Sequence, residues 1–286
     1  MLPVSFLVML LSYFDILPYL FAFAAPLFSL LGLPGDAALV FVTSIFTNIY
    51  TVIALMSNLD FSVREGVILA MMCLISHNYL VETIVQKKTG SSAAAMVILR
   101  LVCSFLGALL LNWLLPEYTQ RVYSQPAVAL GFGDTFLHWL QNSLVLSLKV
   151  VGIISLLMIV QRLLEEFGIL AKISLLLKPL MLFMGLPPSV AFLWLVGNTL
   201  GLAYGSAVLM DYARQGRLSG NDASLLNCHL AVSHSQLEDP LLFAVLGLPM
   251  LWLILPRVLL AIMVVWAKRL IDVVCHPVPQ MQDTKI

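Results

Sequence analysis

Histidines and carboxylates gather in one short stretch of the second half of an otherwise apolar chain: His229, Ser233, His234, Glu238 and Asp239. The first half has a shorter counterpart, because His77 is followed five residues on by Glu82, as His234 is by Asp239. An ionisable group inside a membrane helix costs about 2.5–3.5 kcal/mol on insertion scales, so such residues are functional candidates. Histidine titrates near physiological pH, and a carboxylate neighbour tunes it. We interpret these residues as binding a small polar solute or a coupling proton.

His234 and Glu238 lie four positions apart, which predicts neighbouring side chains on one helix face. The residue before Pro240 is disfavoured in helical geometry, so we expect the second helix to break around Glu238 and Asp239. Freed backbone groups there would line a cavity, as in the discontinuous helices of transporters. Because the second half also holds His229 and the adjacent acidic pair, we expect an asymmetric site weighted toward that half.

Further polar side chains fall in the preceding helix of each half: Asn198, Thr199 and Tyr204 in the second, Asn48 and Tyr50 in the first. Amides and hydroxyls in a membrane interior need hydrogen-bond partners, so we expect these residues to bind the solute. Gly197, Gly201 and Gly205 lie on one helix face, where they admit either a ligand or a packed helix. Arg100 and Arg257 occupy equivalent apolar segments, and they either neutralise buried acids or snorkel at helix ends.

Three other classes of function compete with this interpretation. A divalent-metal site has suitable ligands in His77, His229, His234, Glu238 and Asp239, but no HExxH or comparable spacing supports it. No GxSxG motif or credible catalytic triad is present, so we do not expect an enzyme. No Walker A or Rossmann fingerprint is present, so we expect neither a cofactor nor transport driven by ATP bound on this chain. In a non-transporting scaffold or partner subunit, the polar residues would only hold helices together.

The composition places these residues in a membrane. Hydrophobic residues make up 61% and charged residues 10% of the chain, and the mean hydropathy is +1.00. A soluble domain carries about 25% charged residues. We therefore predict an all-α, multi-pass protein of the bacterial inner membrane, with the lipid bilayer as a partner. The net charge is +0, so nucleic acid is not an expected partner.

The chain also carries an internal repeat. Residues 14–34 align with 167–187 at an offset of 153, with 8 identities in 21 positions. The rare polar residues recur as well, at an offset of 157: His77, Glu82 and Arg100 match His234, Asp239 and Arg257. Ser62 with Glu65, and Ser219 with Asp222, predict helix starts at equivalent places. An internal repeat in a membrane protein is typical of transporters whose site lies between the copies.

We assign residues 1–118 to the first repeat, 119–133 to a connecting loop, 134–272 to the second repeat and 273–286 to a polar C-terminal tail. A helix needs about 20 apolar residues to cross the bilayer. The clearest spans are 36–57, 94–115, 137–161, 188–210 and 249–268. Polar residues interrupt 65–86 and 222–247, and prolines in 3–31 and 167–184 predict kinked, interfacial or re-entrant elements. We favour an odd number of crossings per repeat, which inverts the second copy.

One run of motifs in the second copy resembles a known family. The motifs are Gly197-Asn-Thr-Leu-Gly-Leu-Ala-Tyr-Gly-Ser, Arg217-Leu-Ser, His229 and Ser233-His-Ser-Gln-Leu-Glu-Asp-Pro-Leu-Leu-Phe. They resemble the bacterial nucleoside recognition, or Gate, domain family, best over 185–268 and more weakly over 32–110. At superfamily level, that domain is shared by concentrative nucleoside transporters, the membrane part of ferrous-iron transport protein B and spore maturation membrane proteins.

The resemblance implies membrane transport by two Gate-type repeats, while the substrate differs across the superfamily. The GTPase domain of the iron transporter is absent from this sequence, which puts iron in doubt and removes the obvious energy source. We therefore expect a permease for a small polar solute, for example a nucleoside, bound near mid-membrane between the copies. H⁺ or Na⁺ is the expected coupling ion. A homo-oligomer is compatible with the sequence.

Overall fold

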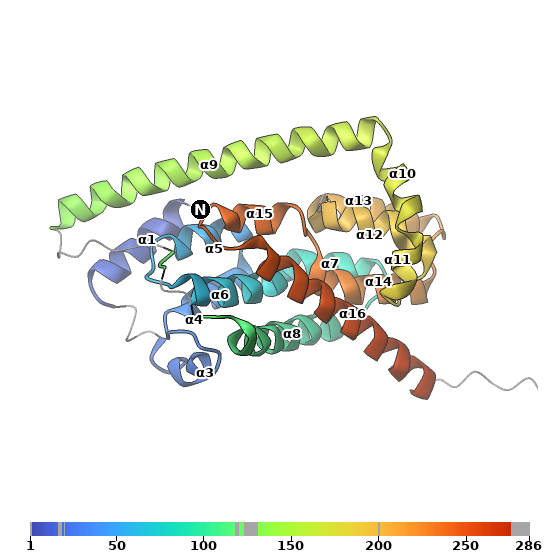
Figure 1. Ribbon diagram of the computed structural model, residues 1–286, viewed down its shortest axis with the longest axis horizontal. Helices are drawn as coiled ribbons and strands as arrows, with labels where there is room; N and C mark the ends of the chain where they lie inside the picture. The colour runs from blue at the N-terminus through green and yellow to red at the C-terminus, as the bar shows by residue number, and fades with distance from the viewer. Residues whose placement is uncertain are drawn as a thin grey trace, which may run out of the picture.

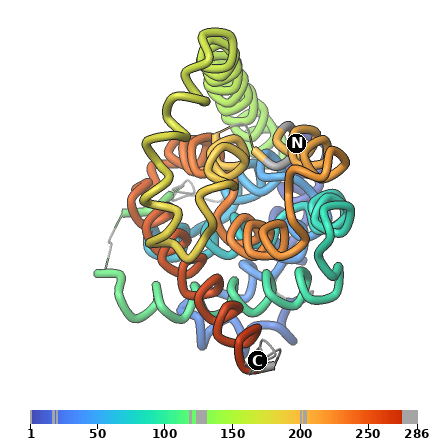
Figure 2. The backbone as a smooth tube through the Cα atoms, turned by 90° about the vertical axis from the view of Figure 1, so that its right-hand side faces the viewer, coloured from blue at the N-terminus to red at the C-terminus, as the bar shows by residue number. Residues whose placement is uncertain are grey.

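The computed structural model describes residues 2–16, 19, 21–117, 120–122, 131–199 and 201–275, without the side chains of 202–204 and 275. Every regular element in these ranges is a helix, and one isolated bridge joins Ser62 to Arg121. Figures 1 and 2 show the helices packed into one elongated bundle, with a single long helix lying along its outside. The expected all-α class is confirmed.

The first copy supplies a row of short helices and one long one. They are α1 (Leu2–Tyr13), α3 (Ala25–Leu30), α4 (Ala37–Phe46), α5 (Ile49–Met56), α6 (Val63–Ser76), α7 (Tyr79–Lys88) and α8 (Ala93–Leu114). At the core of the bundle lies α6, where no side chain from Val67 to Ile75 is exposed. It begins with a full capping box, because Ser62 and Glu65 bond each other's backbone N–H groups.

The second copy repeats this order. Its helices are α9 (Phe132–Glu166), α10 (Ile169–Leu176), α11 (Lys178–Phe183), the 3₁₀ turn η1 (Pro188–Val190), α12 (Ala191–Thr199), α13 (Gly201–Arg214), α14 (Gly220–Ser233), α15 (Glu238–Ala244) and α16 (Met250–Cys275). The counterpart of α6 is α14, which begins at the predicted cap: the Ser219 hydroxyl accepts a bond from the Asp222 N–H.

The two copies run in opposite directions. In Figure 1, α6 and α7 run from left to right, whereas their equivalents α14 and α15 run from right to left. In the same view α8 runs from right to left and α16 from left to right. The copies are therefore antiparallel, which is the arrangement that we favoured from the sequence.

Among the residues that the structure describes, three helices are long and apolar enough to cross a membrane, namely α8, α9 and α16. A fourth span arises if α6 and α7 act together across their 42° bend. The predictions of unbroken helices over 36–57 and 188–210 are wrong. In the first case the chain is extended at Thr47, and Asn48 caps α5 by accepting a bond from the Thr51 N–H at 3.2 Å. In the second, α13 restarts at Gly201, whose φ of +71° favours glycine.

Small differences separate the predicted and observed boundaries of the copies. Helix α9 begins at Phe132, inside the segment that we assigned to the connecting loop. Helix α16 continues to Cys275, so the first residues of the predicted polar tail are helical. The remainder of that tail, 276–286, lies outside the described residues.

Candidate functional site

Two helix breaks in each copy are tied to one another by backbone hydrogen bonds. Between α6 and α7, the Asn78 N–H donates to the carbonyls of Ser44 and Thr47, both at 2.9 Å, beside the break between α4 and α5. Between α14 and α15, the Ser235 N–H donates to the Gly197 carbonyl of α12 at 3.1 Å. Asn78 and Ser235 both have a φ of +50°, which reverses the chain locally. The freed carbonyl groups are thus held in place by the neighbouring break.

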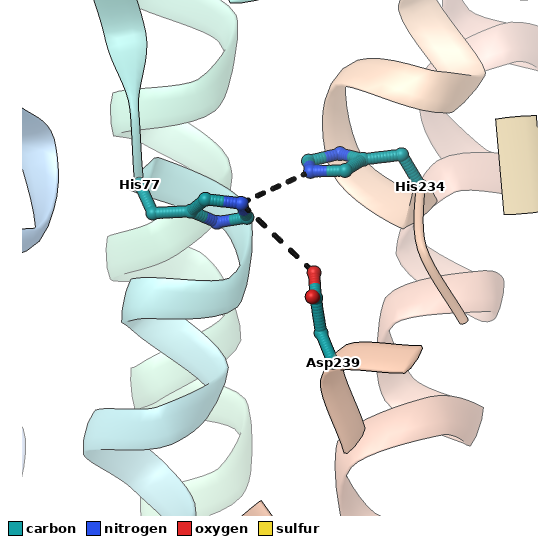
Figure 3. A group of neighbouring side chains, drawn as sticks. All are labelled: His77, His234 and Asp239. Atoms are coloured by element: carbon teal, nitrogen blue, oxygen red, sulfur yellow. Dashed lines mark hydrogen bonds and ion pairs between the residues drawn. The ribbon is translucent and has the colours of Figure 1, made fainter. Parts of the chain in front are cut away.

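His77 and His234 immediately follow α6 and α14 and face each other across the two copies (Figure 3). Each Nδ1 lies against a carbonyl four residues back, 3.1 Å from Cys73 and 2.9 Å from Leu230. Their Nε2 atoms are 3.5 Å apart. The side chains are 9% and 1% exposed, so both rings are largely buried.

Glu82 of α7 joins the two histidines. Its Oε1 lies 3.2 Å from Nε2 of His77 and 3.3 Å from Nε2 of His234. Its Oε2 forms an ion pair with the Arg100 guanidinium at 3.0 Å. One carboxylate of the first copy therefore contacts both imidazoles at the interface between the copies.

Arg100 of α8 and Arg257 of α16 are fully buried and make the same bonds in each copy. Arg100 donates to the carbonyls of Ile75 at 2.7 Å and His77 at 2.5 Å. Arg257 donates to those of Val232 at 3.1 Å and His234 at 2.7 Å. These carbonyls end α6 and α14, where a cation stabilises the negative end of the helix dipole. The snorkelling interpretation of the two arginines is wrong.

Glu238 and Asp239, the acidic pair that begins α15, lie in different environments. Asp239 is buried, and its Oδ2 lies 3.9 Å from Nε2 of His77, toward which it points in Figure 3. Oδ2 has no hydrogen-bond partner among the described residues. Glu238 is partly exposed, and its Oε1 accepts a bond from the Tyr50 hydroxyl of the first copy at 2.8 Å.

A cavity of about 120 Å³ opens beside this cluster. Residues from both copies line it: Asn48, Ile49, Tyr50, His77, Asn78, Val81, Glu82, Val85, Gly201, His234, Ser235, Glu238 and Asp239. The helix breaks therefore surround a small polar chamber whose inner wall is the histidine and carboxylate cluster.

Comparison with known proteins identifies relatives of this chain. No protein-family model matches it, and no solved structure gives a significant match. A protein of Bacillus subtilis, named "Uncharacterized membrane protein YvoD", is 31% identical over 271 residues, which cover 93% of this chain and 86% of that protein. The chain belongs to the YvoD family. The relative is named a membrane protein, and this chain has long apolar helices of its own. We conclude that the chain is a membrane protein.

In this YvoD-family protein, seven of the predicted solute-binding residues line the cavity: Asn48, Tyr50, His77, Glu82, His234, Glu238 and Asp239. Three others turn toward their own helices. Asn198 and Thr199 donate to carbonyls four residues back, Trp194 and Leu195, while Ser233 bonds His229. The side chain of Tyr204 lies outside the described part of the structure.

Three predictions about the cluster are wrong. His234 and Glu238 do not share a helix face, because α14 ends at Ser233 and α15 begins at Glu238. The break thus precedes the acidic pair instead of falling on it, and Pro240 sits in the first turn of α15, where proline is tolerated. His229 stands apart from the cluster, bonded to Ser233 and to the Trp194 indole. Its inclusion among the metal ligands is incorrect.

The sequence patterns of this YvoD-family protein do not identify two residues of the site, Asn78 and Ser235. They occupy the residue after each histidine, and their positive φ values create the reversals that aim His77 and His234 at each other. Asparagine tolerates a positive φ, so Asn78 is a weak indication of a chain reversal in the first copy. Serine is not enriched in this conformation, so Ser235 gives no such indication in the second copy. The sequence predicts a site weighted toward the second copy, but Glu82 of the first copy is the carboxylate that reaches both imidazoles.

Proposed function

We propose that this protein is a bacterial inner-membrane permease that moves a small polar solute or ion through the interface between its two copies. One observation carries the proposal: antiparallel copies bring their helix breaks together around a buried cluster of ionisable side chains and a cavity. Inverted repeats with discontinuous helices at a central site are typical of secondary transporters. The resemblance to Gate-type domains supports the same function.

The size of the cavity narrows the proposed solute. Pockets for drug-sized ligands measure about 300–1,000 Å³, whereas this one measures about 120 Å³. The conformation described here therefore suits an ion or a solute of a few atoms. A nucleoside would need a wider state, in which the bond from Tyr50 to Glu238 across the cavity wall is broken.

Coupling to H⁺ or Na⁺ is part of the proposal. Three carboxylates, those of Glu82, Glu238 and Asp239, lie at the site beside the guanidinium groups of Arg100 and Arg257. Ionisable residues inside a membrane protein mark ion pathways and proton relays. We therefore expect a proton or a cation to bind here.

Reconstitution into liposomes tests the proposal. Uptake of labelled uridine, fluxes of H⁺ and Na⁺ under an imposed potential, and divalent-cation entry would be measured with internal dyes or isotopes. We expect flux of at least one of these species above that of empty liposomes. The double variant His77→Ala and His234→Ala should lose most of it.

The exposed His138 on α9 gives a matched control, and His138→Ala should transport as the native protein does. Flux that survives in the His77 and His234 double variant would remove the cluster from the pathway. No flux of any species tested, together with a stable partner in pull-downs, would favour the scaffold role instead.

A further inference from the structure

The backbone fixes the tautomer of both central histidines. A carbonyl oxygen can only accept, so Nδ1 of His77 and of His234 must carry the proton that it donates to Cys73 and Leu230. In the neutral ring, Nε2 is then a lone-pair acceptor. These Nε2 atoms face each other at 3.5 Å. Each also faces Glu82 Oε1, so three acceptors converge with no donor between them.

The three acceptor atoms form a nearly regular triangle with sides of 3.2, 3.3 and 3.5 Å. A tetrahedral metal ion with ligand bonds of about 2.0–2.1 Å has ligand atoms about 3.3–3.4 Å apart. The triangle therefore matches one face of such a coordination shell. Histidines that bind metals usually donate their other N–H to a carbonyl or carboxylate, as both histidines do here.

Asp239 lies beside this triangle. Its Oδ2 is 3.9 Å from His77 Nε2, and one ligand atom from each of His77, His234 and Asp239 lies within 4.8 Å of the others. Asp239 is 6% exposed, and Oδ2 lacks a hydrogen-bond partner among the described residues. A buried carboxylate oxygen without a partner costs free energy unless a cation or donor meets it.

A single proton satisfies this arrangement less well than a metal ion. A proton placed between two of the acceptors leaves the other atoms of the cluster facing one another unpaired. A cation at the centre contacts all of them. Glu82 and Asp239 supply carboxylate oxygens for such a cation. Arg257 is directed at the carbonyl end of α14, and Arg100 at that of α6 and at Glu82 Oε2.

We propose that His77, His234, Glu82 and Asp239 bind a divalent first-row transition cation, with Zn²⁺ the best fit, in tetrahedral coordination. Two imidazoles and two carboxylates suit Zn²⁺ and its neighbours, whereas Ca²⁺ and Mg²⁺ prefer larger sets of oxygen ligands. Arg100 holds Glu82 Oε2, so that Oε1 faces the imidazoles. The binding site goes beyond the proposed function. Only transport of the bound cation, and not its binding, rests on the proposed function.

Metal titration of the purified full-length protein in detergent tests the site. After treatment with a chelator, Co²⁺ is added while the visible absorption of tetrahedral Co²⁺ is recorded, and Zn²⁺ is then added to displace it. Bound metal is counted by mass spectrometry. We expect one ion per chain, displacement of Co²⁺ by Zn²⁺, a higher midpoint of thermal unfolding with Zn²⁺, and no response to Mg²⁺ or Ca²⁺.

The variants His77→Gln and His234→Gln should each weaken metal binding by about 100-fold or more, because losing a supporting residue alone weakens it about 10–100-fold. His229→Gln is the matched control, since His229 is equally buried but lies outside the cluster. Size-exclusion profiles and the unfolding midpoint without metal verify that each variant is folded.

Less than one ion bound by the native protein at micromolar concentration would overturn the proposal, whatever the variants do. Equal loss of binding in His229→Gln would overturn the assignment to this cluster. Flux through liposomes separates the two proposals. Zn²⁺ binding without flux would keep the site and contradict the permease, whereas flux of another solute without metal binding would do the reverse.

Discussion

Glu82 and Asp239 occupy equivalent positions in the two copies, yet only Glu82 reaches the centre of the site. Its Oε1 lies within 3.3 Å of both imidazoles, and its Oε2 pairs with Arg100. Asp239 Oδ2 stops 3.9 Å short of His77 and has no hydrogen-bond partner among the described residues. The two side chains differ by one methylene group, and Glu82 is the longer of the two.

The two arginines make equivalent bonds to backbone carbonyls but differ in their other contacts. Both bond the last carbonyls of α6 or α14 within their own copy. Arg100 adds an ion pair with Glu82, whereas Arg257 reaches across to the Leu74 carbonyl of the first copy at 3.4 Å. In the first copy the arginine therefore also pairs with a carboxylate of the site, whereas in the second copy it bonds backbone carbonyls.

Removal of each arginine tests this difference most strongly. Arg100→Met leaves Glu82 without its buried counter-ion and should destabilise the protein by about 3–5 kcal/mol. Arg257→Met leaves buried carbonyls without donors and should cost less, roughly 1–3 kcal/mol. Thermal unfolding in detergent, followed by circular dichroism, should rank the two variants in this order.

Lys268→Met supplies the control for that ranking. Lys268 pairs with Asp272 one turn away on the partly exposed end of α16, so its loss should cost at most about 1 kcal/mol. If Arg257→Met were as damaging as Arg100→Met, the ion pair with Glu82 would add nothing, and the two copies would carry the charge of the site equally.

Exchanging the lengths of the two carboxylates sharpens the comparison. Glu82→Asp withdraws the oxygen from both imidazoles and should weaken Zn²⁺ binding by about 10–100-fold, the loss typical when the shell of a metal site is disturbed. Asp239→Glu extends the fourth ligand toward His77 and should hold affinity within about threefold of the native protein, since it adds reach without removing a ligand. The titration with Co²⁺ and Zn²⁺ measures both.

The opposite order of affinities, with Asp239→Glu the more damaging, would show that Asp239 and not Glu82 sets the geometry. A double variant carrying both changes restores one long and one short carboxylate with their places exchanged. If the copies are equivalent apart from this methylene, the double variant should bind more tightly than Glu82→Asp alone.

The sequence predicts the two histidines and the starts of the helices before them, but few of the contacts between the copies. Offsets of the rare polar residues identified His77 and His234, and the capping patterns at Ser62 and Ser219 predicted where α6 and α14 begin. Hydropathy found the long helices α8, α9 and α16. These features depend on neighbours along the chain, which a repeat or a period reports directly.

Contacts between the copies were not predictable in this way. Glu238 was paired with His234 because they are four residues apart, but the reversal at Ser235 separates them and Glu238 bonds Tyr50, 188 positions away. The patterns in 36–57 and 188–210 predict polar ligands on continuous helices, whereas Asn48 and Gly201 mark helix starts. Which copy supplies the central carboxylate depends on a side-chain length of one methylene, and no pattern along the chain reports it.

The caps of α6 and α14 give the smallest expected difference between the copies. Ser62 takes part in a full capping box with Glu65, whereas Ser219 accepts a single bond from the Asp222 N–H at 3.1 Å. Ser62→Ala should therefore cost about 1–2 kcal/mol and Ser219→Ala about 0.5–1 kcal/mol. Ser92→Ala, at the exposed cap of α8, is the matched control for a single bond and should resemble Ser219→Ala. Because α6 is buried along its length, fraying of its first turn also loosens the support of His77 at its other end. If Ser62→Ala destabilised the protein no more than Ser92→Ala does, this link between the cap of α6 and His77 would be contradicted.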